Sequence, residues 1–265
     1  MLYSPTFQTP FSCKKFLLTK KMKMLPLISL VICIIINSGC KDPEPNPANT
    51  GERIIRFSGY DWIVDSSNST KHGPGPNYFS DSEENVWVDQ DGQLHLKITY
   101  RNGHWYCSKV IMKKSYGYNK YVFYVASRVD QLDKNVVGGL FTYMNDQEEI
   151  DIEFSKWSID GNKDSQFAIQ PTSHSGNKIR YNLNLEGNNS THFFNWHKNK
   201  IEFASFQGHT LNPPADKIIE QWTYTGADIP PDSDERVKIN LWLFRGTAPS
   251  DNKEVEMIIK GFEIY

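Results

Sequence analysis

Short runs in which apolar and polar residues alternate recur along the chain after about residue 50. Successive side chains of a β-strand point to opposite faces, so a period of two predicts strands with one buried face. Clusters of Gly, Pro, Asn and Asp, for example at 73–77 and 160–163, separate the runs and predict turns. The runs that predict strands are 53–57, 93–100, 104–112, 120–129, 178–185, 200–206, 236–244 and 254–264.

No segment keeps a period of 3.6 over three turns, so we expect few and short helices. Without the leader described below, about 225 residues remain, a length that all-β sandwiches reach as a single domain. The pattern therefore predicts one all-β domain, with two antiparallel sheets packed as a sandwich.

One of the alternating segments carries three acids. Residues 149–154 read Glu-Ile-Asp-Ile-Glu-Phe, so Glu149, Asp151 and Glu153 share one face of a strand, and the apolar residues share the other. Like charges at neighbouring same-face positions repel, and a strand that only needed solubility has no reason to keep them. A charged, solvated face is the alternative interpretation.

Paired carboxylates are the groups that glycoside hydrolysis requires. One carboxylic acid protonates the leaving oxygen, and a second carboxylate attacks the sugar or activates water. The Cα atoms of Glu149 and Glu153 are expected about 13 Å apart along a strand, so their side chains must lean together. Asp151 between them is placed to hydrogen-bond one carboxyl, and crowding separates the titrations of the three acids.

The segment resembles the catalytic strand of glycoside hydrolase family 16, in the Glu-x-Asp-x-Glu form of lichenases and xyloglucan endotransglycosylases. Motifs in the same order extend the resemblance over about residues 53–265. They are Asn-Val-Trp-Val-Asp at 85–89, Gly-Gln-Leu-His-Leu at 92–96, Tyr-Gly-Tyr at 116–118 with Tyr121, Leu-Phe-Thr-Tyr at 140–143, His-Phe-Phe-Asn-Trp at 192–196 with Ile201 and Phe203, and Ile-Asn-Leu-Trp at 239–242.

The resemblance implies a concanavalin-like β-sandwich jelly roll with a concave substrate cleft. It also implies roles for the three acids: Glu149 as nucleophile, Asp151 as its assistant and Glu153 as acid/base. The implied reaction retains anomeric configuration through a covalent glycosyl intermediate.

Several positions depart from the lichenase pattern. Gln147 and Glu148 stand where lichenases carry Trp and Asp, and Ala168 and Gln170 replace an Asn and a Tyr on the next strand. Lys109 falls near a cleft position where relatives often have Glu or Arg. These changes argue against a plain mixed-linkage glucanase.

Sugars stack their apolar faces on aromatic rings, and 13% of the residues are aromatic. We expect Trp62, Trp87, Trp196 and Trp222 to be structural, because large aromatic residues usually fill a sandwich interior. The predicted substrate contacts are Trp157, Trp242, Asn240, Gln170, Tyr143 and Trp105.

The N-terminal segment is predicted to be a targeting signal. Lysines precede an apolar stretch at 25–36, which is too short for a transmembrane helix and ends in Asn-Ser-Gly-Cys. This resembles a lipobox, which implies cleavage before Cys40 and its acylation; a plain anchor or ordinary secretory signal is the alternative. Met22 or Met24 would give a more usual signal length, so about the first twenty residues are open to a different start site.

Residues after Cys40 read Lys-Asp-Pro-Glu-Pro-Asn-Pro, which predicts an extended tether. The Lys and acids resemble a surface-export signal of bacterial lipoproteins. The predicted organisation is a leader at 1–39, a lipidated tether at 40–52 and a hydrolase domain at 53–265, anchored to the bacterial outer membrane and exposed at the cell surface or in the periplasm. Cys107 is then alone in the mature domain, so no internal disulfide forms, and we expect it to be buried.

Other chemistries have little support. The net charge of −2, with acids and bases interspersed, gives no nucleic-acid footprint. The seven His residues lack metal-ligand spacing, so we predict no cofactor, and no calcium site is assigned. The predicted protein is a monomeric, endo-acting, retaining β-glycan hydrolase whose partners are a polysaccharide and, through Cys40, a membrane. A non-catalytic carbohydrate-binding jelly roll and a transglycosylase with the same residues are the alternatives.

Overall fold

The computed structural model describes residues 51–265; the predicted leader, Cys40 and most of the tether lie outside them. Strands dominate the described part, and its helices are three short 3₁₀ turns, η1 (Val129–Gln131), η2 (Ala215–Lys217) and η3 (Phe244–Gly246). The prediction of an all-β chain with few, short helices is confirmed. None of the helices within 51–265 is long and apolar enough to cross a membrane.

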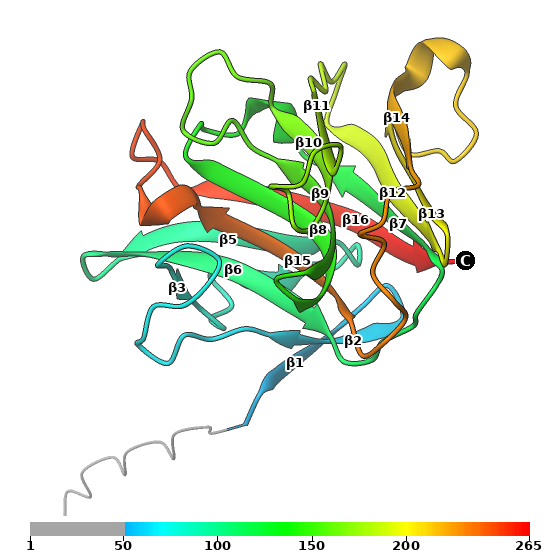
Figure 1. Cartoon of the computed structure of the whole chain (residues 1–265). Coiled ribbons are helices and arrows are strands. Elements are labelled where there is room, and N and C mark those ends of the chain that lie inside the picture. Colours follow the sequence, from blue (N-terminus) through cyan, green and yellow to red (C-terminus); the bar gives the residue numbers. More distant parts are fainter. Residues whose placement is uncertain (1–50) are drawn as a thin grey trace, which may run out of the picture. The chain divides into compact units, whose positions relative to one another are not determined.

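Two antiparallel sheets form the sandwich (Figure 1). The inner sheet, which carries the three acids, has the order β11 (Lys178–Tyr181), β10 (Ser165–Ile169), β9 (Glu148–Phe154), β8 (Val136–Asn145), β15 (Arg236–Leu243), β6 (His104–Met112), β2 (Tyr60–Val64) and β1 (Arg53–Phe57). The outer sheet has the order β4 (Val86–Val88), β5 (Leu94–Arg101), β16 (Val255–Ile264), β7 (Lys120–Ala126), β12 (Asn189–His197), β13 (Lys200–Gln207) and β14 (Ile218–Tyr224).

The two sheets are continuous through one hairpin. β5 belongs to the outer sheet and β6 to the inner one, yet the two pair at Thr99–Tyr106, Tyr100–Trp105 and Arg101–His104. The short strand β3 (Tyr78–Phe79) adds a parallel pairing to β6. The result is a nearly closed jelly roll, which confirms the predicted fold class.

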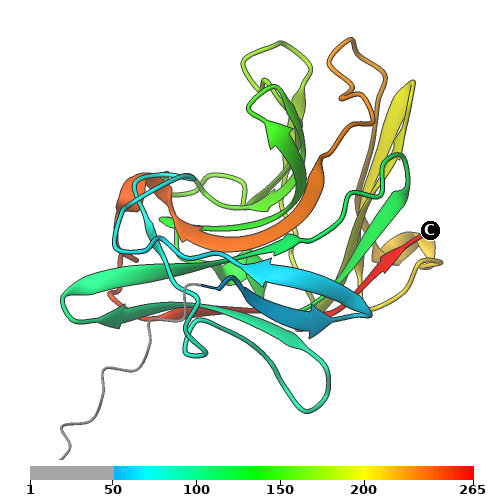
Figure 2. The same cartoon turned by 90° about the horizontal axis from the view of Figure 1, so that it is seen from below.

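The hydrophobic core lies between the sheets. On β9, Ile150, Ile152 and Phe154 are fully buried in it, as the alternation of the segment predicts. The acids alternate with them and therefore lie on the opposite face of the inner sheet. This face is concave because the inner sheet is curved, and the bend of β15 (orange) is clear in Figure 2.

Two predicted strands end early. The run at 120–129 stops at Ala126 and the run at 178–185 stops at Tyr181. Beyond these ends, carboxylates accept the donors: Asp130 accepts two hydrogen bonds from Arg128, at 2.8 and 2.7 Å, and the backbone N–H groups of Leu183 and Leu185 donate to Asp164 at 2.9 Å and to Asp130 at 3.3 Å. Side-chain bonds replace the ladder bonds here, and alternation alone does not reveal that.

Three of the five residues expected in the interior, Trp62, Trp196 and Cys107, are almost fully buried. Trp222 is half-buried and packs on the core residue Phe203 with ring centroids 5.2 Å apart. Burial raises the pKa of the Cys107 thiol to about 12, so this side chain serves as a small hydrophobe. Trp87 is only half-buried: it lies on the outer sheet, stacked on His95 with ring centroids 4.5 Å apart.

Candidate active site

The pairing of strands places the site residues in rows across the concave face. In one row Glu153 lies between Gly139 on β8 and Gln166 on β10. The row continues through Asn240 to Lys109 on one side, and to Arg180 on the other. The next row contains Asp151, flanked by Ala168 with Lys178 on one side and by Phe141 with Lys238 on the other.

Two adjoining hollows lie over these rows and share Pro74, Glu149, Glu153 and Trp242. We call the first the β15 hollow; its volume is about 440 Å³ and its other lining residues are Gly73, Lys109, Gly139, Phe141, Tyr143, Asp146, Asp151, Lys238 and Asn240. We call the second the β11 hollow; its volume is about 460 Å³ and its other lining residues are Trp157, Ile159, Asn162, Gln166, Gln170, Thr172, Lys178 and Arg180. Together they form a cleft that extends to both sides of the two glutamates.

The two glutamates keep part of their surface open to the cleft, whereas Asp151 is buried at 2% exposure. Burial, followed by the charge of Glu153, raises the pKa of Glu149 to about 7. Burial also raises the pKa of Glu153 to about 7, against the hydrogen bond from Gln166 and the charges of Arg180 and Lys178. Near neutral pH the pair is thus poised to hold one proton and one charge.

Asp151 lies between Glu149 and Glu153 on β9, and we call these three acids the triad. Burial raises its pKa well above the ordinary range, and the charges of Glu149 and then of Glu153 add to this effect. A hydrogen bond between the carboxyl groups of Asp151 and Glu149 raises the pKa of Asp151 further and lowers that of Glu149. This contact orients Glu149 and favours its ionised form.

Two glutamines of the neighbouring segment hold the triad from one side. Gln166 Nε2 donates to Glu153 Oε2 at 2.6 Å, and Gln170 Nε2 donates to Asp151 Oδ2 at 3.2 Å. The side-chain oxygen of Gln170 accepts from the backbone N–H of Thr172 at 3.1 Å. Gln170, a predicted substrate contact, lines the β11 hollow, but both ends of its amide bind the protein.

Asn240, another predicted substrate contact, lines the β15 hollow at 3% exposure. Its Oδ1 is buried and has no hydrogen-bond partner within the described residues. A Cβ atom on Gly139 would lie 2.5 Å from this oxygen, so a glycine is needed there. An unpaired buried acceptor is costly unless a ligand supplies the donor, and a sugar hydroxyl is such a donor.

Trp157 and Trp242 meet where the two hollows join. Their ring centroids are 6.2 Å apart in an edge-to-face arrangement, and Phe244 packs edge-on against Trp157 at 5.2 Å. The backbone of Trp157 has φ = 54° and that of Ser158 has φ = 59°, a left-handed conformation that side chains disfavour. Hydrogen bonds from Trp157 N to Ser155 Oγ and from Ser158 N to Lys134 O hold this turn.

Tyr143 lies in the row of Glu149, opposite it on β8. Its hydroxyl donates to Asp146 at 2.9 Å, and the Nζ atom of Lys238 lies 3.7 Å from the centre of its ring. Burial lowers the pKa of Lys238 to about 8, and its charge lowers the pKa of Glu149. Tyr143 and Lys238 therefore form the wall of the β15 hollow beside Glu149.

Trp105 does not reach the cleft. It lies in the β5–β6 hairpin, where its ring packs on that of Tyr100 at 5.1 Å, and it lines neither hollow. The prediction of a substrate contact at Trp105 is thus not supported by its position, because the hairpin extends beyond the curved part of the sheet.

Several cleft residues were not among the predicted contacts. Lys238 shares the face of Asn240 and Trp242 by alternation, and Phe141 shares the face of Tyr143, so the period of two contains the signal for both. Lys178 and Arg180 reach the cleft only because β11 pairs with β10. The loop carrying Gly73 and Pro74 is brought in by a hydrogen bond from Lys109 Nζ to Gly73 O at 3.1 Å.

No protein-family model and no curated protein matches the sequence. Solved structures with the same fold do match it. A β-glucanase from Bacillus licheniformis has 19% sequence identity and a TM-score of 0.58, over 81% of this chain and 97% of its own. A β-1,3-1,4-glucanase (lichenase) from a mouse hindgut metagenome has 19% identity and a TM-score of 0.56, over 81% of this chain and 98% of its own.

A mixed-linkage-glucan GH16 protein from Bacteroides ovatus, in complex with a G4G4G3G product, has 16% identity and a TM-score of 0.55, over 77% of this chain and 94% of its own. At these identities the likeness establishes the fold. This chain therefore has the fold of the family 16 glycoside hydrolases, as its motifs predicted.

Proposed function

We propose that the protein is an endo-acting, retaining glycoside hydrolase that cleaves a β-linked polysaccharide. One observation carries this proposal: three acids from one strand share the floor of an open cleft, where burial raises the pKa of all three, to about 7 for Glu149 and Glu153. A merely solvated face would leave its acids exposed and ionised at neutral pH.

In the proposed reaction Glu149, kept charged by Asp151, attacks the anomeric carbon while Glu153 protonates the leaving oxygen. The glycosidic bond breaks, and an ester forms between the sugar and Glu149. Glu153, now ionised, removes a proton from water, and the resulting hydroxide displaces Glu149. The sugar leaves with its original anomeric configuration, and both acids return to their starting states.

Cleavage inside a chain is supported by the shape of the cleft. The two hollows adjoin at the glutamates, so glycan can extend past the cleavage point in both directions. Trp242 and Trp157 offer ring surfaces for stacking at this junction, and Asn240 offers an unpaired acceptor. The glucanases that share the fold make β-glucans the first substrates to test, while the altered residues Gln147, Ala168 and Gln170 call for a wider panel.

A reducing-sugar screen tests the proposal. The full-length chain is incubated with laminarin, lichenan, xyloglucan, agarose and carrageenan, beside Glu149→Gln and Glu153→Gln. Glu148→Gln is the matched control, because Glu148 lies on the same strand but lines neither hollow. We expect release of oligosaccharides by wild type and Glu148→Gln and a loss of at least about 10³-fold in the other two variants.

The screen also separates the alternatives. Binding of a glycan by wild type without any cleavage would leave a carbohydrate-binding protein. Products longer than the substrate, at high concentration of an oligosaccharide acceptor, would identify a transglycosylase that uses the same ester on Glu149.

We further propose that the chain is tethered to the bacterial outer membrane through acylated Cys40. Palmitate labelling of the expressed chain tests this: incorporation in wild type and its loss in Cys40→Ser is expected. Labelling that persists in Cys40→Ser would contradict the assignment.

A further inference from the structure

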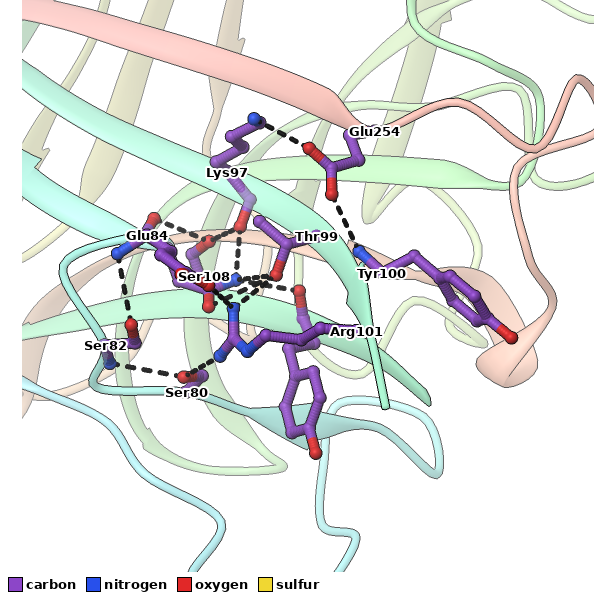
Figure 3. A network of polar contacts seen from close by, with 11 residues as sticks. Ser80, Ser82, Glu84, Lys97, Thr99, Tyr100, Arg101, Ser108 and Glu254 are labelled. Carbon is purple, nitrogen blue, oxygen red and sulfur yellow. Dashed lines mark hydrogen bonds and ion pairs between the residues drawn. The ribbon is translucent and has the colours of Figure 1, made fainter. Parts of the chain in front are cut away.

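Two cations of the outer sheet, Lys97 and Arg101, are paired with neighbouring carboxylates. In the network of Figure 3, Lys97 Nζ lies 2.7 Å from Glu254 and Arg101 Nη1 lies 3.0 Å from Glu84. Arg101 also donates to Ser80 Oγ at 2.7 Å. A hollow of about 760 Å³ lies among these residues, but its charges already have partners.

Of the two cations that line the β15 hollow, Lys109 has an ion pair, and Lys238 has none among residues 51–265. Lys109 Nζ lies 2.9 Å from Asp65. Lys238 lies over the ring of Tyr143, and it interacts with the charge of Glu149. Asp146 adds a further carboxylate to the lining of this hollow.

The β11 hollow differs. Lys178 and Arg180 both line it, and neither has a carboxylate within ion-pair distance among residues 51–265. The nearby acids that act on Arg180 are Glu153, which must lend a proton in the reaction, and Asp164. With Glu153 protonated, these two cations outnumber Glu149, which is the one ionised glutamate in the lining of this hollow.

Arg180 is held in a fixed position at the floor of this hollow. Its Nη1 donates to Gln166 Oε1 at 3.0 Å, and its Nη2 donates to the carbonyl oxygens of Ser155, at 2.7 Å, and Lys163. Its Nε is buried without a partner in the described part of the chain. Lys178 is exposed and comes from the neighbouring row. Arg180 is thus fixed by hydrogen bonds to the protein, whereas Lys178 is exposed to solvent.

Two simpler roles exist for these cations. Both lower the pKa of Glu153, and a lysine on an edge strand such as β11 discourages pairing with other chains. Neither role needs both cations to line the hollow where a sugar would lie, or a half-buried guanidinium to remain without a carboxylate partner.

We propose that the β11 hollow binds a sugar with an anionic substituent, a sulfate ester or a carboxylate, through Lys178 and Arg180. This inference deepens the proposed function and rests on it, since it names the substrate class of the same cleft. An oxyanion there supplies the negatively charged partner that both cations lack, and charge-assisted bonds of this kind are stronger than neutral ones.

Binding is measured in the full-length Glu149→Gln protein, so that the glycan is not consumed. Two matched sets serve as probes: laminarin with its sulfated and its C6-oxidised, carboxylate-bearing derivatives, and carrageenan with its desulfated form. The measured quantity is the ratio of affinity for the charged glycan to that for its neutral counterpart. Lys178→Gln, made as a second substitution in the Glu149→Gln protein, tests the contribution of the Lys178 charge. Lys260→Gln in the same protein is the control, because Lys260 is also an exposed strand lysine without an ion pair among residues 51–265 but lies on β16 of the outer sheet.

We expect a ratio well above one in at least one set, and Lys178→Gln lowers it about three- to five-fold, the upper range for one exposed charge contact. Lys178→Glu lowers it further, Lys260→Gln leaves it unchanged, and raising salt from 20 to 200 mM weakens the charged glycan selectively. The affinity ratios of sulfated and of carboxylate-bearing laminarin, compared with each other, show which anionic group the hollow prefers.

A ratio of one in every set, or a ratio that Lys178→Gln and Lys178→Glu do not change, would overturn the inference. Cleavage of a neutral glycan by wild type would then leave the proposed hydrolase intact. Conversely, charged glycan bound through Lys178 without cleavage by wild type would support the anionic site and overturn the hydrolase.

Discussion

The hydrogen bond between Gln166 and Glu153 predicts a specific shift of the pH–rate profile in Gln166→Met. In the proposed reaction Glu149 must be ionised and Glu153 protonated, so kcat/KM plotted against pH is bell-shaped. The acid limb reports the ionisation of Glu149 and the alkaline limb that of Glu153, as apparent pKa values of the coupled pair. Both individual pKa values are about 7. The donor at 2.6 Å favours the ionised form of Glu153, so its loss keeps Glu153 protonated to higher pH.

The size of the shift follows from the strength of the bond. Hydrogen bonds to charged groups contribute about 1.5–3 kcal/mol, and a pKa unit corresponds to about 1.4 kcal/mol, so the range is about one to two units. Glu153 keeps part of its surface open to the cleft, where water replaces some of the lost interaction. We therefore expect the alkaline limb to rise by about one unit while the acid limb moves little.

The assay is kcat/KM between pH 4 and 10 on the best glycan of the screen, with folding checked by circular dichroism. Gln170→Met is the matched control, because its donor binds Asp151, whose proton is already held by burial and by Glu149. An alkaline limb that stays in place in Gln166→Met, or that moves down, would refute this account of Glu153.

Other predictions concern stability and the cleft walls. The pKa of Glu153 is higher in the folded protein than the ordinary 4.5, so the folded chain binds more protons than the unfolded chain and stability falls as pH rises from about 4.5 to 7. Glu153→Gln should therefore raise the free energy of unfolding at pH 8, by at most about 3 kcal/mol, and leave it unchanged at pH 4; urea unfolding at both values checks this, and an equal gain at both would contradict it. Gly139→Ala places a Cβ against Asn240 Oδ1 and should lower kcat/KM about tenfold, but it should cost much less in an Asn240→Ala background; equal losses in both backgrounds would show that the two sites act independently. Lys238→Met removes a charge that lowers the pKa of Glu149, so the acid limb of the pH–rate profile should rise by roughly half a unit, and a limb that falls would contradict this role.

Much of the candidate site could be predicted from the alternation of apolar and polar residues within single strands. The alternation in 149–154 placed the three acids on one face over a buried apolar face, because the strand period of two is a property of the backbone itself. The same period placed Asn240 beside Trp242 on one face. The all-β class followed from many short alternating runs without a helical period, and the family motifs added the jelly roll.

Pairing between distant strands could not be predicted in the same way. The row that joins Lys109, Asn240, Gly139, Glu153, Gln166 and Arg180 depends on the registers of five strand pairs, each fixed by packing of the whole sheet. Trp105 was assigned to the cleft for lack of that information. Gln170 was treated as a sugar contact, whereas its position opposite the triad gives it a bond to Asp151.

The central claim, that Glu149 is the nucleophile and Glu153 the acid/base, is tested most directly by azide rescue of Glu149→Ala and Glu153→Ala. With an activated aryl β-glycoside of the sugar found in the screen, azide should enter the space left by each carboxylate. We predict that Glu149→Ala yields the α-glycosyl azide, by direct displacement, and that Glu153→Ala yields the β-glycosyl azide, through the ester on Glu149, as read by proton NMR. The opposite pairing of variants and anomers would reverse the two roles, and no azide product from either variant would contradict the mechanism.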